Sequence, residues 1–137
     1  PTMHIVEIDR ERPDFRVFID LLYGENRNVD TEGDSDHVYS RSWTYLYIAD
    51  RESDDPPIEI FARDGQPSSF AVESEFERLE ELAALYLFLT SGKSISDGTS
   101  KPVDVSELMA KYSLELHRAA NAVWHKSSSD LPHPGLA

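Results

Sequence analysis

The chain has 137 residues, no cysteine and a formal net charge of −13, from 26 acidic residues against 13 Lys and Arg. Its hydrophobic content of 39% is enough for a packed core, and the lack of cysteine excludes disulfides, thiolate nucleophiles and cysteine-ligated zinc. The negative charge argues against nucleic acid and anionic membranes as direct partners, because both are bound through patches of Lys and Arg.

The N-terminal third predicts a strand, a helix and an acidic loop. Residues 3–8 are rich in β-formers and predict the first strand. Residues 12–24 fit a helix that begins near Pro13 and ends at Gly24, but their apolar residues also alternate as in a strand; we favour the helix. Residues 25–36 are acidic and almost free of apolar side chains, which predicts a long mobile loop.

The middle of the chain predicts a sheet. Residues 37–50 give the clearest strand pattern, residues 58–63 predict a strand that pairs antiparallel with it, and residues 69–72 predict a short edge strand. One face of this sheet is expected to be buried through Leu46, Ile48, Ile58 and Ile60. The other face would present the aromatic row of residues 37–50, which consists of Tyr39, Arg41, Trp43, Tyr45 and Tyr47. This row either packs in the core under a helix or forms an exposed face that anchors a partner.

The C-terminal part predicts two helices. The first would begin with the capping box Ser74–Glu77 and end at Gly92, and a polar loop would follow. The second would begin with the capping box Asp104–Glu107 and continue for about 20 residues to Lys126. The expected fold class is therefore α+β, with a small, mostly antiparallel sheet and the two C-terminal helices packed on one face.

The chain is expected to form a single domain over residues 1–126, with a flexible tail over residues 127–137. The N-terminus has no basic flank followed by an apolar stretch, so we expect no signal peptide. The longest apolar run, residues 82–89, is shorter than the ~20 residues needed to span a bilayer. We therefore expect a soluble, cytoplasmic protein.

No motif in the sequence identifies a catalytic residue, a metal site or a cofactor. Residues 92–94, Gly-Lys-Ser, match the end of a phosphate-binding loop, but the first glycine of that motif would fall at Leu87, inside the predicted helix. Residues 30–36 are similar to a calcium loop but have the glycine at the wrong position. His117 and His125 lie two helical turns apart, which is too far for both to bind one metal ion.

The acidic residues are clustered in three segments: residues 25–36, 50–55 and 73–81 together account for −11 of the net charge of −13. Such clusters favour a basic protein as partner, with the acidic side chains steering its approach and Tyr and Trp anchoring it. Solubility, or a salt-loving source, would also explain the acidity.

We therefore predict a binding module, either an inhibitor or an immunity-type protein that neutralises a basic toxin or nuclease. The alternatives are a structural or oligomeric subunit, which includes a homo-oligomer, and a metal-dependent enzyme that uses carboxylates or histidines. The predicted partner-binding residues are Asp30, Glu32, Asp34, Asp36, Asp54, Asp55, Tyr39, Trp43 and Tyr45.

Overall fold

A computed structural model of the chain describes residues 2–13, 15–24, 28–34 and 41–121. The strands are β1 (Thr2–Ile8), β2 (Val29–Gly33), β3 (Tyr45–Asp50), β4 (Ile58–Arg63), β5 (Gln66–Ser74) and β6 (Gly92–Asp97). The helices are α1 (Phe15–Tyr23), α2 (Glu77–Ser91), α3 (Val105–Lys111) and α4 (Ser113–Asn121). The fold is α+β, as predicted.

The six strands form one sheet in the order β2-β3-β4-β5-β1-β6, and every neighbouring pair is antiparallel. The N-terminal strand β1 therefore lies between β5 and β6. The predicted strands at residues 3–8 and 58–63 are confirmed, and β4 pairs with β3 so that Leu46 lies opposite Ile60.

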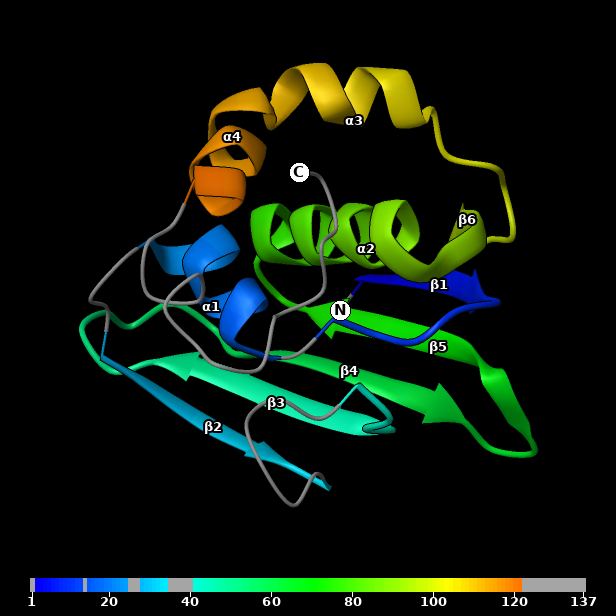
Figure 1. Cartoon of the computed structure of the whole chain (residues 1–137), viewed down its shortest axis with the longest axis horizontal. Helices are drawn as coiled ribbons and strands as arrows, with labels where there is room; N and C mark the ends of the chain where they lie inside the picture. The colour runs from blue at the N-terminus through cyan, green and yellow to red at the C-terminus, as the bar shows by residue number, and fades with distance from the viewer. Residues whose placement is uncertain (1, 14, 25–27, 35–40, 122–137) are drawn as a thin grey trace.

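All four helices lie on the same side of the sheet (Figure 1). Helices α1 and α2 contact the strands, whereas α3 and α4 pack on α2 and α1 as an outer layer. The core lies between the sheet and the inner helices. There, Phe18 makes edge-to-face contacts with Trp43 and Tyr86 at centroid distances of 6.1 and 5.6 Å. None of the helices in the described ranges has the length and apolar composition that crossing a membrane requires.

The preference for a helix over residues 12–24 is confirmed by α1. The buried residues Val17, Phe18, Leu21 and Leu22 follow the helical period, which explains why the apolar pattern favoured a helix. Gly24 ends the helix with a φ of 90°, and its N–H donates to the Asp20 carbonyl at 3.1 Å. This left-handed conformation favours glycine.

Two predictions for residues 25–50 are wrong. The expected mobile loop contains β2, which pairs with β3 along its whole length, while residues 25–27, 35 and 36 lie outside the described residues. The expected strand over residues 37–50 begins only at Tyr45. Residues 41–44 precede it in irregular conformation, and residues 37–40 are outside the described part. Strand β2 forms through backbone pairing with β3 at the edge of the sheet. A polar edge strand needs no apolar pattern, so this strand has no signal in the sequence.

Two further predictions placed β5 and the start of α2 incorrectly. The expected edge strand is a nine-residue central strand, β5, between β4 and β1. Ser74 belongs to this strand and does not cap the helix; its hydroxyl donates to the Pro57 carbonyl at 2.9 Å. The N-cap of α2 is Phe76, without a side-chain hydrogen bond. Strand pairing therefore continues to the residue where the capping box was expected.

The segment after α2 also differs from the prediction. Gly92 ends α2 as expected, but it is extended and begins strand β6, where a polar loop was predicted. The Asp104 cap is confirmed, because its side chain accepts the Glu107 N–H at 3.0 Å. The single long helix is divided at Tyr112 into α3 and α4, and its predicted end beyond residue 121 lies outside the described residues, as does the predicted tail.

Candidate functional site

The sheet face opposite the helices is the first candidate surface. The side chains that alternate with the buried ones along β1, β3 and β4 point to this side. No helix within the described ranges covers it (Figure 1). We call it the outer face, and it presents aromatic, aliphatic and acidic side chains together: Met3, Ile5, Glu32, Tyr45, Tyr47, Glu59, Phe61 and Glu73.

Three glutamates form a row across the outer face. Glu32 lies opposite Tyr47, Tyr47 opposite Glu59, and Glu59 opposite Glu73. We call Glu32, Tyr47, Glu59 and Glu73 the acidic row. Directly opposed side chains in neighbouring strands have Cβ atoms only about 5 Å apart, and like charges at this spacing destabilise a sheet. Stability therefore does not explain why Glu59 and Glu73 are paired.

A small hollow lies at one end of the pair Glu59–Glu73. Its volume is about 220 Å³, and it is lined by Pro56, Pro57, Glu59, Glu73, Ser74 and Glu75. Three carboxylates therefore surround a space beside two proline rings. This combination suits the head and the aliphatic stem of a Lys or Arg side chain.

The structure brings together only some of the predicted partner-binding residues. Asp30 and Glu32 project from β2 on the same face as Tyr45 and Tyr47, because Asp30 pairs with Ala49 and Glu32 with Tyr47. The Tyr45 hydroxyl donates to Glu59 at 3.1 Å. Burial and this hydrogen bond raise the pKa of Tyr45, so its hydroxyl stays protonated as a donor at neutral pH.

Trp43 is not part of this surface, which corrects the prediction for the aromatic row. Its side chain is only 2% exposed, its ring contacts Phe70 edge-to-face, and its indole N–H donates to the Pro13 carbonyl at 2.8 Å. Because the strand begins at Tyr45, the alternation does not extend back to position 43 and the side chain turns into the core. Tyr39 and Asp36 lie outside the described residues.

The remaining predicted partner-binding acids that the structure describes, Asp34, Asp54 and Asp55, lie in the connections between strands. The Asp34 carboxylate accepts the backbone N–H groups of Thr44 and Tyr45 at 2.9 and 3.1 Å, and also the Thr44 hydroxyl. Burial raises the pKa of Asp34, but these hydrogen bonds outweigh it and hold the pKa below its ordinary value. Asp34 therefore has a structural role. Asp54 and Asp55 are exposed in the connection between β3 and β4.

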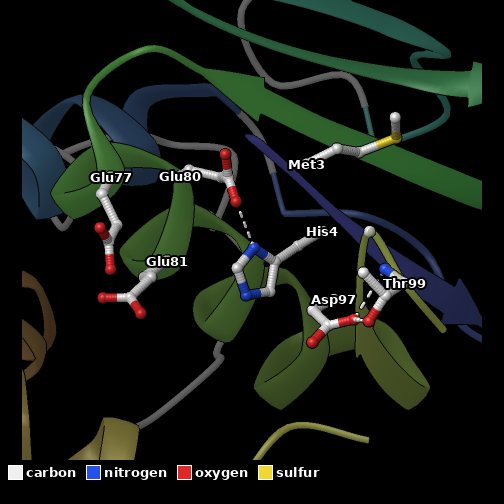
Figure 2. Close-up of a pocket in the computed structure, with 8 residues that line it drawn as sticks. Met3, His4, Glu77, Glu80, Glu81, Asp97 and Thr99 are labelled. Atoms are coloured by element: carbon white, nitrogen blue, oxygen red, sulfur yellow. Dashed lines mark hydrogen bonds and ion pairs between the residues drawn. The ribbon is translucent and has the colours of Figure 1, made fainter. Parts of the chain in front are cut away.

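A larger cavity lies between β1, the first turn of α2 and the turn after β6 (Figure 2). Its volume is about 500 Å³, and it is lined by Met3, His4, Glu77, Glu80, Glu81, Asp97, Gly98 and Thr99. The His4 Nδ1 atom lies 2.5 Å from the Glu80 carboxylate, which is 1% exposed. An ionised carboxylate can only accept, so Nδ1 carries the hydrogen and Nε2 is left facing the cavity.

Two other carboxylates of this cavity, Glu81 and Asp97, are held in place by hydrogen bonds. Glu81 accepts hydrogen bonds from Lys111 at 2.8 Å and from the Tyr112 hydroxyl at 2.6 Å. Burial raises the pKa of Glu81, but these two bonds outweigh it and lower the pKa. The Asp97 pKa is lowered by hydrogen bonds from the Thr99 hydroxyl and N–H and from the Lys101 N–H. Both groups are therefore anionic at neutral pH.

Sequence reasoning missed both Glu80 and the pair Glu59–Glu73. Glu80 lies within the apolar stripe of α2, one turn after Phe76 and one turn before Ala83 and Ala84, which is a sequence signal of burial. Glu59 stands between the buried Ile58 and Ile60, so its orientation was predictable. Its contact with Glu73 was not, because it depends on the register of two strands.

The residues of the larger cavity do not form a metal centre. In the described part of the chain, no three His, Asp or Glu side chains converge closely enough to hold a metal ion. Comparisons of the chain with protein-family models, curated proteins and solved structures found no match.

Proposed function

We propose that this chain is a small acidic binding module whose outer face binds a basic protein, in the manner of an inhibitor or an immunity-type protein that neutralises a toxin or nuclease. The observation that carries this proposal is the acidic row, in which Glu59 and Glu73 lie directly opposite each other on a sheet face that no helix of the described residues covers. A repulsive pair that costs stability is expected where a positive partner compensates for it.

The composition of the outer face supports the same proposal. Tyr45, Tyr47 and Phe61 are half-buried on it, and aromatic side chains are the usual anchors of protein interfaces. The acids beside them would accept Lys or Arg from the partner and speed its approach, because the net charge of −13 acts over the whole molecule. The active sites of nucleases are electropositive, and such a site is a suitable target.

The hollow beside Glu59 and Glu73 is the place where we expect a Lys or Arg of the partner to insert. Its three carboxylates can pair with a guanidinium in several orientations. The chain has no cysteine, so it needs no oxidising environment, and we place its action in the cytoplasm.

The experiment that tests this proposal compares two triple variants of equal net charge. The first, Glu32→Gln/Glu59→Gln/Glu73→Gln, removes the carboxylates of the acidic row. The second, Glu11→Gln/Asp64→Asn/Glu107→Gln, removes three exposed carboxylates elsewhere. Each immobilised protein is used to capture partners from native lysate at low salt, followed by a salt gradient and identification of the eluted proteins.

We expect one basic protein to be retained by the wild type and by the second variant, and to be lost from the first. With that protein purified, the row variant should associate roughly tenfold more slowly, because steering charges act mainly on the association rate. Equal retention by both variants would show that only overall charge matters. Failure to retain any basic protein would favour a structural subunit instead.

A further inference from the structure

We infer that the basic partner docks an extended segment along the edge of β2 and so adds a strand to the sheet. Strand β2 lies at one end of the strand order, and within the described residues it pairs only with β3 (Figure 1). We call the side of β2 that faces away from β3 the β2 edge. The inference rests on the proposed function and deepens it, because it names the form in which the partner presents its Lys and Arg side chains.

The backbone groups that point outward along the β2 edge follow from the hydrogen bonds at the two ends of the strand. The Asn28 carbonyl accepts the Arg51 N–H at 3.0 Å. The Asp34 N–H donates to the Tyr45 carbonyl at 3.4 Å, so both Asn28 and Asp34 face β3. Because direction alternates along an antiparallel ladder, every second residue between them also faces β3, and the others point outward. The outward residues of β2 are Val29, Thr31 and Gly33.

The two edges of the sheet differ in whether the chain itself covers them. At the opposite edge, the segment that follows β6 folds back on this strand. The Asp97 N–H donates to the Lys101 carbonyl at 2.9 Å, and the Ile95 carbonyl accepts the Val103 N–H at 3.4 Å. At the β2 edge, the described part of the chain supplies no such partner for the outward N–H and C=O groups. An unpaired strand edge is the template on which an extended peptide adds to a sheet.

The side chains of β2 define the sequence that such a segment would carry. Asp30 and Glu32 lie on the outer face, where Glu32 begins the acidic row. Thr31 lies on the other face, opposite the buried Ile48. An added strand would therefore place Lys or Arg beside the two acids and β-branched residues at the alternate positions. Asp30 already accepts a hydrogen bond from Arg51 at 3.3 Å, so we expect Glu32 to contribute more.

The charges of β2 argue against a second copy of this chain as the occupant. Two β2 edges pair only with their outward residues facing each other, for example around Thr31 of both copies. Asp30 of one copy would then lie opposite Glu32 of the other, and the same contact would occur twice. Like charges directly opposite each other destabilise a sheet, whereas a basic segment would neutralise them.

The test uses the full chain and the peptide acetyl-Lys-Val-Lys-Val-Lys-amide, which has Lys and a β-branched residue at alternate positions. The control peptide has the same sequence but is methylated on both Val nitrogens, so it keeps the charge and cannot donate to the β2 edge. Binding is followed by NMR of the backbone amides and by their hydrogen exchange. The protein variants are Thr31→Pro, which removes an outward N–H at an edge position where proline is tolerated, and Thr31→Ala, the matched control that keeps this N–H.

We expect saturable binding of the first peptide, with slower hydrogen exchange at the outward amides of Val29, Thr31 and Gly33. The methylated peptide, and the first peptide with Thr31→Pro, should each bind roughly tenfold more weakly, because hydrogen bonds to the edge are lost, while Thr31→Ala should leave the Kd within about twofold. Equal binding of the two peptides, or equal Kd values for the two variants, would overturn the inference. Slower exchange of these amides in the protein alone, as its concentration rises, would assign the edge to a second copy and overturn it as well.

The lysate capture described for the proposed function, repeated with Thr31→Pro and Thr31→Ala, separates the two proposals. Retention of the basic protein by Thr31→Pro, together with its loss from the row variant, would overturn the inference and leave the proposed function intact. If the wild type retains no basic protein, the proposed function fails, and the peptide titration still decides the inference. The amide spectrum of Thr31→Pro checks its fold, and the methylated peptide tests the edge on the wild type if that variant does not fold.

Discussion

The Tyr112 hydroxyl donates to Glu81 in the contact that joins α3 to α2, and Lys111 donates to the same carboxylate. Burial raises the pKa of Tyr112 to about 12, and the hydrogen bond to Glu81 acts in the same direction. The Lys111 pKa is raised as well, chiefly by its hydrogen bond to Glu81. Both residues therefore keep their protons more firmly in the folded protein than in the unfolded chain.

This contact predicts how stability depends on alkaline pH. A raised pKa in the folded state stabilises the protein fully below the unfolded value of 10.0, and the contribution of Tyr112 is lost as the pH rises through about 12. The free energy of unfolding, measured in urea at several pH values, should fall over this window. The free energy of unfolding of the Tyr112→Phe variant should fall less steeply with pH. A residual slope is expected, because burial also raises the pKa of Tyr23 to about 12. An identical slope in the variant and the wild type would contradict the assignment.

The pair His4–Glu80 is a second feature at the scale of single residues. Burying a carboxylate is costly unless it is paired, and Glu80 is nearly inaccessible to solvent. Replacing such a pair with well-packed apolar side chains is often neutral or stabilising. The pair is therefore explained more readily by the orientation that it gives the imidazole than by a gain in stability.

The junction between α2 and β6 is the feature of most consequence at the scale of elements. The helix ends at Ser91 and the strand begins at Gly92, so the chain reverses without a loop. A Cβ atom at position 92 would lie 2.8 Å from the Phe88 Cα and 3.0 Å from a Val6 methyl group. Glycine is needed at this position because β1 and α2 leave no space for a side chain. The backbone conformation is not the reason, because an extended φ of −94° is open to any residue.

We expect Gly92→Ala to destabilise the protein by about 1–3 kcal/mol, because the added methyl group overpacks the junction. The neighbouring Lys93 is exposed, and Lys93→Ala should change the free energy of unfolding by no more than about 0.5 kcal/mol. Urea denaturation of both variants measures the difference. Unchanged stability in Gly92→Ala would show that the junction can relax.

The outer face is a property of the whole molecule, because the order of the six strands decides which side chains lie next to one another on it. Two of the five neighbouring strand pairs, β1 with β5 and β1 with β6, join segments that are distant in the chain. The helices of the described residues lie on the other face of the sheet.

The repulsion across the acidic row predicts a trade between stability and binding. Glu73→Lys converts a repulsive cross-strand pair with Glu59 into an attractive one, and it should stabilise the fold by about 0.2–1 kcal/mol. Glu75→Lys makes the same change in net charge two residues further along the chain, and it is the control in urea denaturation. The stabilised variant should bind the basic partner more weakly than the wild type. A loss of stability specific to Glu73→Lys would contradict the proposed repulsion.

The elements that could be predicted are those whose signal is local. The helical period within residues 12–24, with Pro13 near its start and Gly24 at its end, favoured the helix α1, and the Asp104 cap was sufficient for the start of α3. Strand β2 could not be predicted, because its polar sequence is held by pairing with β3 alone. The direction of the Trp43 side chain depended on where β3 begins. A strand that included position 43 would have placed this side chain on the outer face, but β3 begins at Tyr45 and the side chain points into the core.

By itself, the sequence determined the fold class, the apolar layers and the strong negative charge, because periodicity and composition act over a few neighbouring residues. The tertiary structure alone decided which charges meet. His4 and Glu80 are 76 positions apart, and Glu59 faces Glu73 only in the observed register. Both candidate sites are made of such distant contacts, and packing and strand order, which no local pattern encodes, bring their residues together.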